Sequence, residues 1–474
     1  MSRFSFAAVL AACLASPLSA QPEGFPPLDA TEIYREMDLQ TLVRAYSDMH
    51  PEVGFLSVYN AYLKEGSTQQ NVGIMETSVD SRQIVLTANS ETIYAVHPVN
   101  LSEQGGAVVV EVPQGMQGMA NAPGWWNITD IGGLGPDRGQ GGRYLFTAPD
   151  YVGEIPDGYY HFESPANTIL WLLRGFVEDG DTEAAVANMQ AGIRTYSLSD
   201  AANPPETTFY NTSESMTNGQ PMDMLYEKED VLPMVRQYFE LNGPNANPMR
   251  EGLYSLLYDA GFFDGTVDPT LLNEATAIGD INQRTRTFNN RAPNSFKWPD
   301  ESSWQWANNY ADENFTDRAN GVYSSSQHQV WSHMATFNSV GMTRPPRGTG
   351  SQYIYSSKDS EGQWLDGGNH YTLTIPAEPP ADDFWSIILY DAEYRSMLKN
   401  ESFRWGVNSY AEDLEFEDDG SAVLHFAPEQ PDGVAMRNWV ETNPGEGYMI
   451  WFRTYGPTDA WYDDSWILPN ISKQ

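Results

Sequence analysis

The stretch "FWSIILYD", residues 384–391, decides the fold of the C-terminal part of the chain. Alternate side chains of an extended segment point to opposite faces, and apolar side chains occupy both faces here as far as Tyr390. This pattern is typical of a strand that is covered on both sides. We therefore predict a buried strand whose polar end, Tyr390 and Asp391, meets a loop. Arg395 follows four residues after Asp391, where it can pair with that carboxylate as a brace or belong to a functional site.

Similar β-branched and aromatic runs recur on both sides of a helical middle. "GAVVVEVP" and "GRYLFTAP" come from the first half, and "HYTLTIP" and "GYMIWFRTYGP" come from the second. Turn residues separate such runs at intervals of roughly ten residues, which is typical of β-sandwiches. Residues 30–65 and 181–290 instead have apolar residues at helical spacing, with Asp181, Gly243 and Gly261 as caps.

The sequence therefore predicts a mixed, mainly β fold, with two antiparallel β-sandwich or jelly-roll-like domains and a helical region between them. Its expected segments are a signal peptide (1–20), a helical lead-in (21–70), a first β domain (71–178), a helical region (179–290), an irregular connector (291–345) and a second β domain (346–474).

The first 20 residues have the pattern of an export signal. A short basic start precedes the apolar run "FSFAAVLAACLA", and "SPLSA" provides a cleavage site after Ala20. We therefore expect a periplasmic or secreted protein. The alternative is a lipoprotein anchored at Cys13, because "LAAC" resembles a lipobox. No later stretch reaches the roughly 20 apolar residues of a membrane-spanning helix, and Cys13 is the only cysteine, so the mature chain has no disulfide.

The charge of the chain excludes some partners. Its 474 residues include 64 acidic and 26 basic side chains, which gives a formal net charge of −38. Such a surface repels nucleic acid and anionic membranes. It fits a solvated acidic coat, or alternatively a site for cations or cationic ligands. The partner that we expect is a small molecule, and no residue pattern specifies a cofactor or an oligomeric state.

Several catalytic motifs are missing from the sequence. It has no Gly-x-Ser-x-Gly elbow, and the Gly-rich segment "GGLGPDRGQGG" lacks the Gly-Lys-Ser/Thr of a phosphate-binding loop. None of the seven histidines occurs in a His-x-x-x-His or His-Glu-x-x-His pattern, and we predict no metal site.

Two sets of motifs resemble known families. "NSETIYAVHPVNL", "GPDRGQGGRYLFTAPDYVGEIPDGYYHFESP" and "LLRGF" resemble DUF1254, a domain of unknown function. "GSQYIYSSKDSEGQWLDGGNHYTLTIP", "DDFWSIILYDAEYRSML", "DDGSAVLHF" and "NWVETNPGEGYMIWFRTYGP" resemble DUF1214, its usual C-terminal companion. The resemblance implies two β-sandwich-like domains with helices between them, and it implies no particular activity. Glu91 stands where the family motif usually has aspartate.

The candidate site residues are polar groups near the ends of the expected strands. The catalytic candidates are Glu91, Tyr94, Asp130 and Asp391. The candidates for ligand binding are Asn89, Trp126, Arg138, Tyr390, Arg395 and Arg404. We expect them to line a cleft where the β domains meet. The working hypothesis is a hydrolase for a small polar or aromatic-ring substrate that uses carboxylate or tyrosine acid–base chemistry. The alternative is a non-catalytic ligand-binding protein of the cell envelope or the extracellular space.

Overall fold

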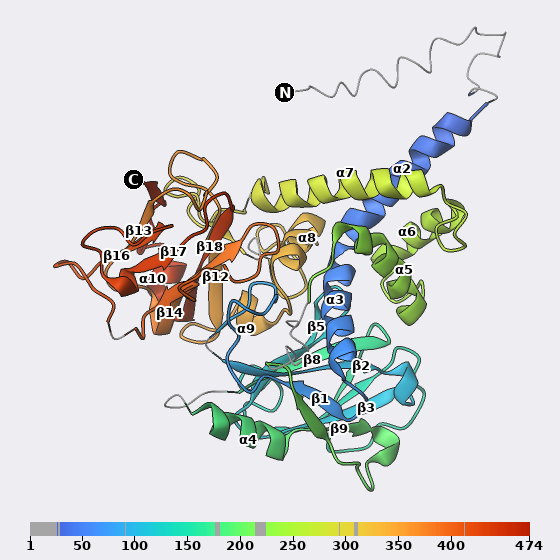
Figure 1. The fold of residues 1–474 in the computed structure, drawn as a ribbon. Helices are drawn as coiled ribbons and strands as arrows, with labels where there is room; N and C mark the ends of the chain where they lie inside the picture. Colours follow the sequence, from blue (N-terminus) through green and yellow to red (C-terminus); the bar gives the residue numbers. More distant parts are fainter. Residues whose placement is uncertain are drawn as a thin grey trace.

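The computed structural model describes residues 26, 29–90, 92–175, 181–213, 224–292, 294–307, 311–411 and 413–474. Two strand-rich domains lie beside each other with helices between and above them (Figure 1). The predicted mixed, mainly β architecture is therefore confirmed. Within the described residues, no helix has the length and apolar character that crossing a membrane requires.

The N-terminal domain contains two sheets. A six-stranded sheet has the order β10-β1-β2-β8-β4-β5, and a four-stranded sheet has the order β7-β6-β3-β9. The strands are β1 (Asn71–Ile74), β2 (Ile93–Asn100), β3 (Ala107–Val112), β4 (Gln117–Ala122), β5 (Trp126–Ile131), β6 (Gly142–Thr147), β7 (Tyr160–Glu163), β8 (Thr168–Gly175), β9 (Arg194–Ser197) and β10 (Thr208–Asn211). Both β9 and β10 lie in the segment that we expected to be helical. They pair with β3 and β1, so tertiary pairing decides the conformation of these four-residue runs.

The C-terminal domain also contains two sheets, with the orders β11-β12-β18-β14-β15 and β17-β16-β13-β19. The strands are β11 (Gln305–Trp306), β12 (Ser351–Ser356), β13 (Tyr371–Ile375), β14 (Ala381–Asp391), β15 (Gly406–Asn408), β16 (Ala422–Ala427), β17 (Trp439–Glu441), β18 (Tyr448–Pro457) and β19 (Ser472–Lys473). The stretch "FWSIILYD" lies in β14, between β18 and β15, and its residues 385–390 are all buried. The expectation of a strand covered on both sides is confirmed.

Helices lie both between the two domains and within them (Figure 1). They are α2 (Thr31–Asp48), α3 (His50–Glu65), α4 (Thr182–Gly192), α5 (Val231–Asn242), α6 (Pro248–Asp259), α7 (Pro269–Phe288), α8 (Ser325–Met334), α9 (Val340–Thr343) and α10 (Asp459–Tyr462). The helical lead-in is broken at Met49, because Pro51 has no amide hydrogen with which to continue α2. The expected irregular connector contains α8 and α9.

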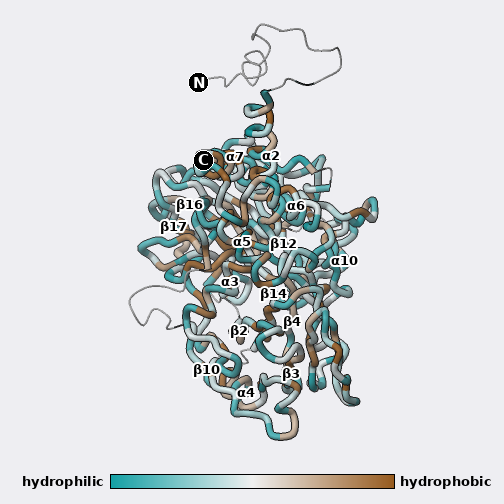
Figure 2. Tube along the Cα trace, turned by 90° about the vertical axis from the view of Figure 1, so that its right-hand side faces the viewer, coloured by the Kyte–Doolittle hydropathy of each residue, from teal (hydrophilic) through white to brown (hydrophobic). Residues whose placement is uncertain are grey.

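Helix α7 runs above α3 and the N-terminal domain, from α2 toward the C-terminal domain (Figure 1). It approaches α2 closely at Gly279, where a Cβ atom would lie 2.4 Å from the ring of Tyr46. Figure 2 places α2 and α7 at the top, β12 and β14 in the middle, and β3, β10 and α4 at the bottom. One hydrophobic core includes Leu172 of β8 and Trp451 of β18, so the two domains share a continuous apolar interior.

Candidate functional site: a cavity between the two β domains

A cavity of about 110 Å³ lies between the two domains. The strands β2, β4 and β8 line it from the N-terminal sheet, and β12 and β18 line it from the C-terminal sheet. The segment 85–89 and the residues that follow α8 complete the wall. Most of the lining is apolar, and it includes Met75, Val79, Val85, Val96, Met119, Leu172, Met224, Phe337, Met342 and Trp451.

Two arginines enter this apolar cavity, one from each domain. Arg174 is on β8, directly opposite Tyr94 of β2. Arg453 is on β18, directly opposite Tyr353 of β12. Each arginine lies on a strand with a neighbour on both sides, β8 between β2 and β4, and β18 between β12 and β14. Two sheet interiors therefore each direct a guanidinium toward the space between the domains.

Arg453 is buried, at 3% exposure, and is only partly satisfied by hydrogen bonds. Its Nη2 donates to the carbonyl oxygen of Thr87 at 2.8 Å and lies 3.4 Å from that of Ala88. Its Nη1 is buried and has no hydrogen-bond partner among the described residues. The guanidinium carbon lies 5.4 Å from the ring centroid of Trp451, a distance that permits a cation–π contact.

Arg174 is partly buried, and its guanidinium carbon lies 5.7 Å from the ring centroid of Tyr94. Within the part of the chain that the structure describes, neither Arg174 nor Arg453 forms an ion pair with a carboxylate. Burial lowers the pKa of each guanidinium, but neighbouring tyrosines outweigh burial and raise both pKa values above the ordinary range. Both side chains therefore remain cationic.

The structure brings three of the predicted site residues to this cavity or beside it. Asn89 and Tyr94 line the cavity, and the amide of Asn89 donates to the Tyr94 hydroxyl at 3.3 Å. Tyr390 lies next to it, fully buried, with its hydroxyl donating to the carbonyl oxygen of Ala88 at 2.6 Å. The candidate Glu91 lies outside the described residues.

Asp391 and Arg395 line a separate cleft of about 930 Å³. The Asp391 carboxylate accepts from the backbone amides of Glu393, Tyr394 and Ser396 and from the Ser396 hydroxyl. Asp391 therefore caps the turn after β14.

The expected ion pair between Asp391 and Arg395 does not form. The Arg395 guanidinium donates instead to the carbonyl oxygens of His333 and Glu393, while its own carbonyl accepts from the amide of Thr87. Arg395 is buried and has a positive φ of 57°, a backbone conformation that residues other than glycine rarely adopt.

The same cleft contains two histidines that the sequence patterns do not reveal. Nε2 of His50 lies 2.8 Å from the hydroxyl of Tyr226, and the rings of His50 and His333 have centroids 5.3 Å apart. Burial lowers the pKa of His50 to about 3 and that of His333 well below its ordinary value. These residues come from α3, α8 and the segment before α5, so no local spacing could have indicated their proximity.

The remaining candidates are dispersed. Asp130 is buried, and its carboxylate accepts from the amides of Val340 and Gly341, both at 3.1 Å, so it caps the start of α9. Burial raises its pKa. Arg138 is exposed in the loop between β5 and β6. Arg404 lines a third hollow, of about 690 Å³, beside the edge strand β15.

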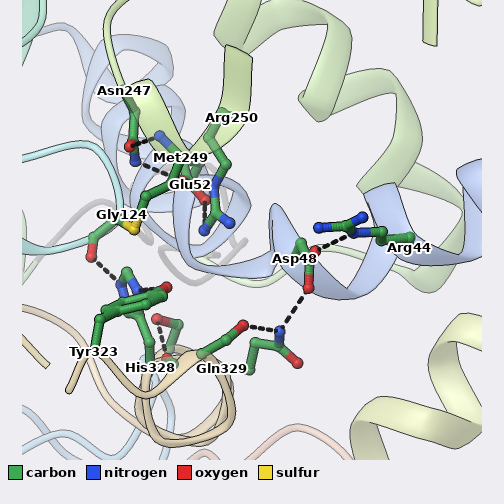
Figure 3. Close-up of polar contacts among 12 residues, drawn as sticks. Arg44, Asp48, Glu52, Gly124, Asn247, Met249, Arg250, Tyr323, His328 and Gln329 are labelled. Atoms are coloured by element: carbon green, nitrogen blue, oxygen red, sulfur yellow. Dashed lines mark hydrogen bonds and ion pairs between the residues drawn. The ribbon is translucent and has the colours of Figure 1, made fainter. Parts of the chain in front are cut away.

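Trp126 lies in an aromatic cluster that belongs to a buried polar network. Its ring centroid is 5.1 Å from that of His328, and Nδ1 of His328 is 3.0 Å from the hydroxyl of Tyr323. Figure 3 shows His328 and Tyr323 near the buried ion pair between Glu52 of α3 and Arg250 of α6, whose closest atoms are 2.9 Å apart. This network connects α3, α6 and α8. Trp126 packs against it, which favours a structural role for Trp126.

Comparisons with known families agree with the domain order. The structure has two β domains with a cavity of about 110 Å³ between them. The family described as "Protein of unknown function (DUF1254)" matches residues 70–197, and "Protein of unknown function (DUF1214)" matches residues 350–459. The chain belongs to the proteins that carry DUF1254 followed by DUF1214, as the sequence predicted.

The solved structures that match have little sequence in common with this chain. The VPA0106 protein from Vibrio parahaemolyticus matches with a TM-score of 0.52 and 15% identity, over 92% of this chain and 100% of its own. A putative uncharacterized protein from Burkholderia cenocepacia matches with a TM-score of 0.40 and 13% identity, over 96% of this chain and 90% of its own. No curated protein matches. The first similarity supports the fold and carries no function.

Proposed function

We propose that the protein binds a small, largely apolar organic molecule in the cavity between its two β domains. The observation that carries this proposal is the cavity itself, which has an apolar lining from both domains and a few convergent polar groups. Ligand sites have this character. An engineered apolar cavity of about 150 Å³ binds benzene, so the space here, of about 110 Å³, suits a ligand the size of one ring.

Ring-sized probes test the proposal. A ligand that binds only the native state raises the melting temperature, and the stabilisation grows with the logarithm of the ratio of ligand concentration to Kd. We expect benzene, phenol or a comparable probe to stabilise the protein, and Met342→Trp, which adds bulk at the cavity wall, to remove that stabilisation. The matched control is Met436→Trp, because Met436 is exposed and lies outside the cavity lining. If no probe stabilises the wild type, or if Met342→Trp changes nothing, the proposal is wrong.

Hydrolysis is the second candidate function, and Tyr94 is the observation that favours it. Of the three catalytic candidates that the structure describes, only Tyr94 lines the cavity, where its phenol lies beside Arg174. Asp130 and Asp391 both accept backbone amides elsewhere, which favours structural roles for them. A phenol next to a guanidinium can serve as a general acid. We expect any esterase activity on ring-sized esters to disappear in Tyr94→Phe while ring-sized ligands still bind.

We also propose that residues 1–20 direct export to the periplasm or the medium. These residues lie outside the described part of the chain, and the proposal rests on their signal-peptide pattern. The mass of the protein isolated from its own cell envelope or medium tests it. A chain that begins at Gln21 supports cleavage after Ala20, a lipid-modified Cys13 supports the lipoprotein alternative, and an intact Met1 contradicts both.

A further inference from the structure

The two arginines in the cavity indicate the charge of the ligand, whereas the volume of the cavity indicates only its size. We infer that the cavity takes an organic anion, a carboxylate on a ring-sized apolar body, with Arg174 and Arg453 as its counter-ions. This inference rests on the proposed ligand-binding function and deepens it. It assigns the carboxylate to the guanidinium side of the cavity and the apolar body to the methionine-rich side.

The first argument is the imbalance of charge inside the protein. The whole chain has only 26 basic residues against 64 acidic ones, yet two of the basic side chains lie in one interdomain cavity. Neither has a carboxylate partner among the described residues. Burying a charge without a partner is costly. A bound carboxylate removes this cost, because guanidinium and carboxylate form strong, charge-assisted hydrogen bonds.

The second argument is the set of neutral donors near the two guanidinium groups. The tyrosines Tyr94, Tyr353 and Tyr455 all line the cavity, and all three interact electrostatically with Arg174. A neutral phenol can donate to a carboxylate but adds no competing negative charge. The buried Nη1 of Arg453, which has no partner among the described residues, supplies a further donor.

The burial of Arg453 also has a structural explanation, which applies less to Arg174. Arg453 braces the segment 85–89 through the carbonyl oxygen of Thr87 and packs among aromatic rings. Replacing Arg453 can therefore unfold the protein, and a loss of binding in that variant would say nothing about the ligand. Arg174 is less buried and has no comparable backbone contact among the described residues. Arg174 is therefore the residue to replace first.

A pair of nearly isosteric probes separates this inference from the proposed function. Benzoate and benzamide have the same ring, but only benzoate carries a charge. Isothermal titration of the full-length mature protein should show benzoate binding at least about tenfold more tightly than benzamide, as a charge-assisted contact implies. Arg174→Gln should weaken benzoate by about tenfold or more and leave benzamide within about threefold. The control Arg138→Gln makes the same change at an exposed loop and should alter neither affinity.

Each other outcome has a separate meaning. If neither probe binds, the proposed function fails together with the inference. If both bind with equal affinity, the ligand site stands and the anion inference is overturned. Glu91 lies outside the described residues, so Glu91→Gln completes the test. If only the Glu91→Gln variant prefers benzoate, Glu91 already neutralises the guanidinium groups, and the inference is overturned.

Discussion

The hydroxyl of Tyr390 donates a hydrogen bond of 2.6 Å to the carbonyl oxygen of Ala88, and this bond joins the two β domains. Tyr390 ends the buried part of β14, whereas Ala88 lies in the segment that enters β2. Arg453 strengthens the same junction through Thr87. The polar end of "FWSIILYD" therefore holds one domain against the other and places the segment 85–89 at the cavity wall.

Removing the Tyr390 hydroxyl should weaken this junction. Tyr390→Phe leaves the ring in place but deprives a buried carbonyl of its closest donor, so we expect the free energy of unfolding to fall by about 1–2 kcal/mol. Urea unfolding measures the change. The control Tyr258→Phe removes a hydroxyl from an exposed tyrosine and should have almost no effect. Equal stability of Tyr390→Phe and wild type would show that the bond contributes nothing to domain association.

Asp391 should prove structural. Asp391→Asn replaces a carboxylate that accepts four hydrogen bonds by an amide whose NH2 group faces donors, so we expect a loss of about 2–3 kcal/mol in urea unfolding. Ring-sized ligands should still bind, because Asp391 does not line the cavity. The exposed Asp432→Asn is the matched control. If Asp391→Asn instead keeps normal stability but loses esterase activity, Asp391 is again a catalytic candidate.

The buried pair of Glu52 and Arg250 should show strong coupling. Glu52→Gln leaves the Arg250 guanidinium buried without its counter-ion, and we expect a cost of about 3–5 kcal/mol. Replacing both residues, Glu52→Gln with Arg250→Met, should cost less than the sum of the single changes, because the second change removes the stranded charge. A double-mutant cycle in urea measures this difference. Additive single costs would mean that the pair does not act as a unit.

Acid should destabilise the fold through its buried histidines. The pKa of His50 and that of His97 are both lowered to about 3, with burial as the first cause, and both side chains are almost fully buried. In the unfolded chain a histidine titrates near pH 6.5. Between about pH 6.5 and pH 3 the unfolded state therefore binds more protons, and stability falls as the pH is lowered through this range.

Melting temperatures measured between pH 7 and pH 4 check this expectation. Each such histidine contributes up to about 1.4 kcal/mol per pH unit. His50→Gln removes one of these groups but keeps a polar partner near the Tyr226 hydroxyl, so its melting temperature should depend less steeply on pH than that of the wild type. The same dependence in both proteins would contradict the assignment of a neutral, buried His50.

The sequence predicted the fold better than the site, and particular residues show why. The alternation in "FWSIILYD" is a local signal, and it was sufficient to identify β14. Asp181, which caps α4, and Gly243, which ends α5, are likewise local signals, and both are confirmed. By contrast, β9 and β10 are four-residue strands whose partners lie far away in the sequence, so their short runs carried no decisive pattern.

The cavity depends on contacts that no sequence spacing encodes. Arg174 and Arg453 line the same cavity because the interior strands of the two sheets that bear them face each other. Both arginines stand out in a chain with few basic residues, which was the available signal. The sequence could not distinguish them from Arg138, which is exposed, or from Arg404, which lies at a strand edge.

The parallel pairing of β1 with β10 has a consequence for how the protein is made. Asn71 and Thr208 are 137 positions apart, and β10 lies beyond the end of the DUF1254 match at residue 197. A chain that has emerged from the ribosome only as far as residue 197 has an uncovered edge at β1, and such edges recruit other strands. Contacts between such distant positions also form slowly. The N-terminal sheet is therefore complete only when residues 208–211 are present, and we expect a chain that stops at residue 197 to expose one edge of this sheet.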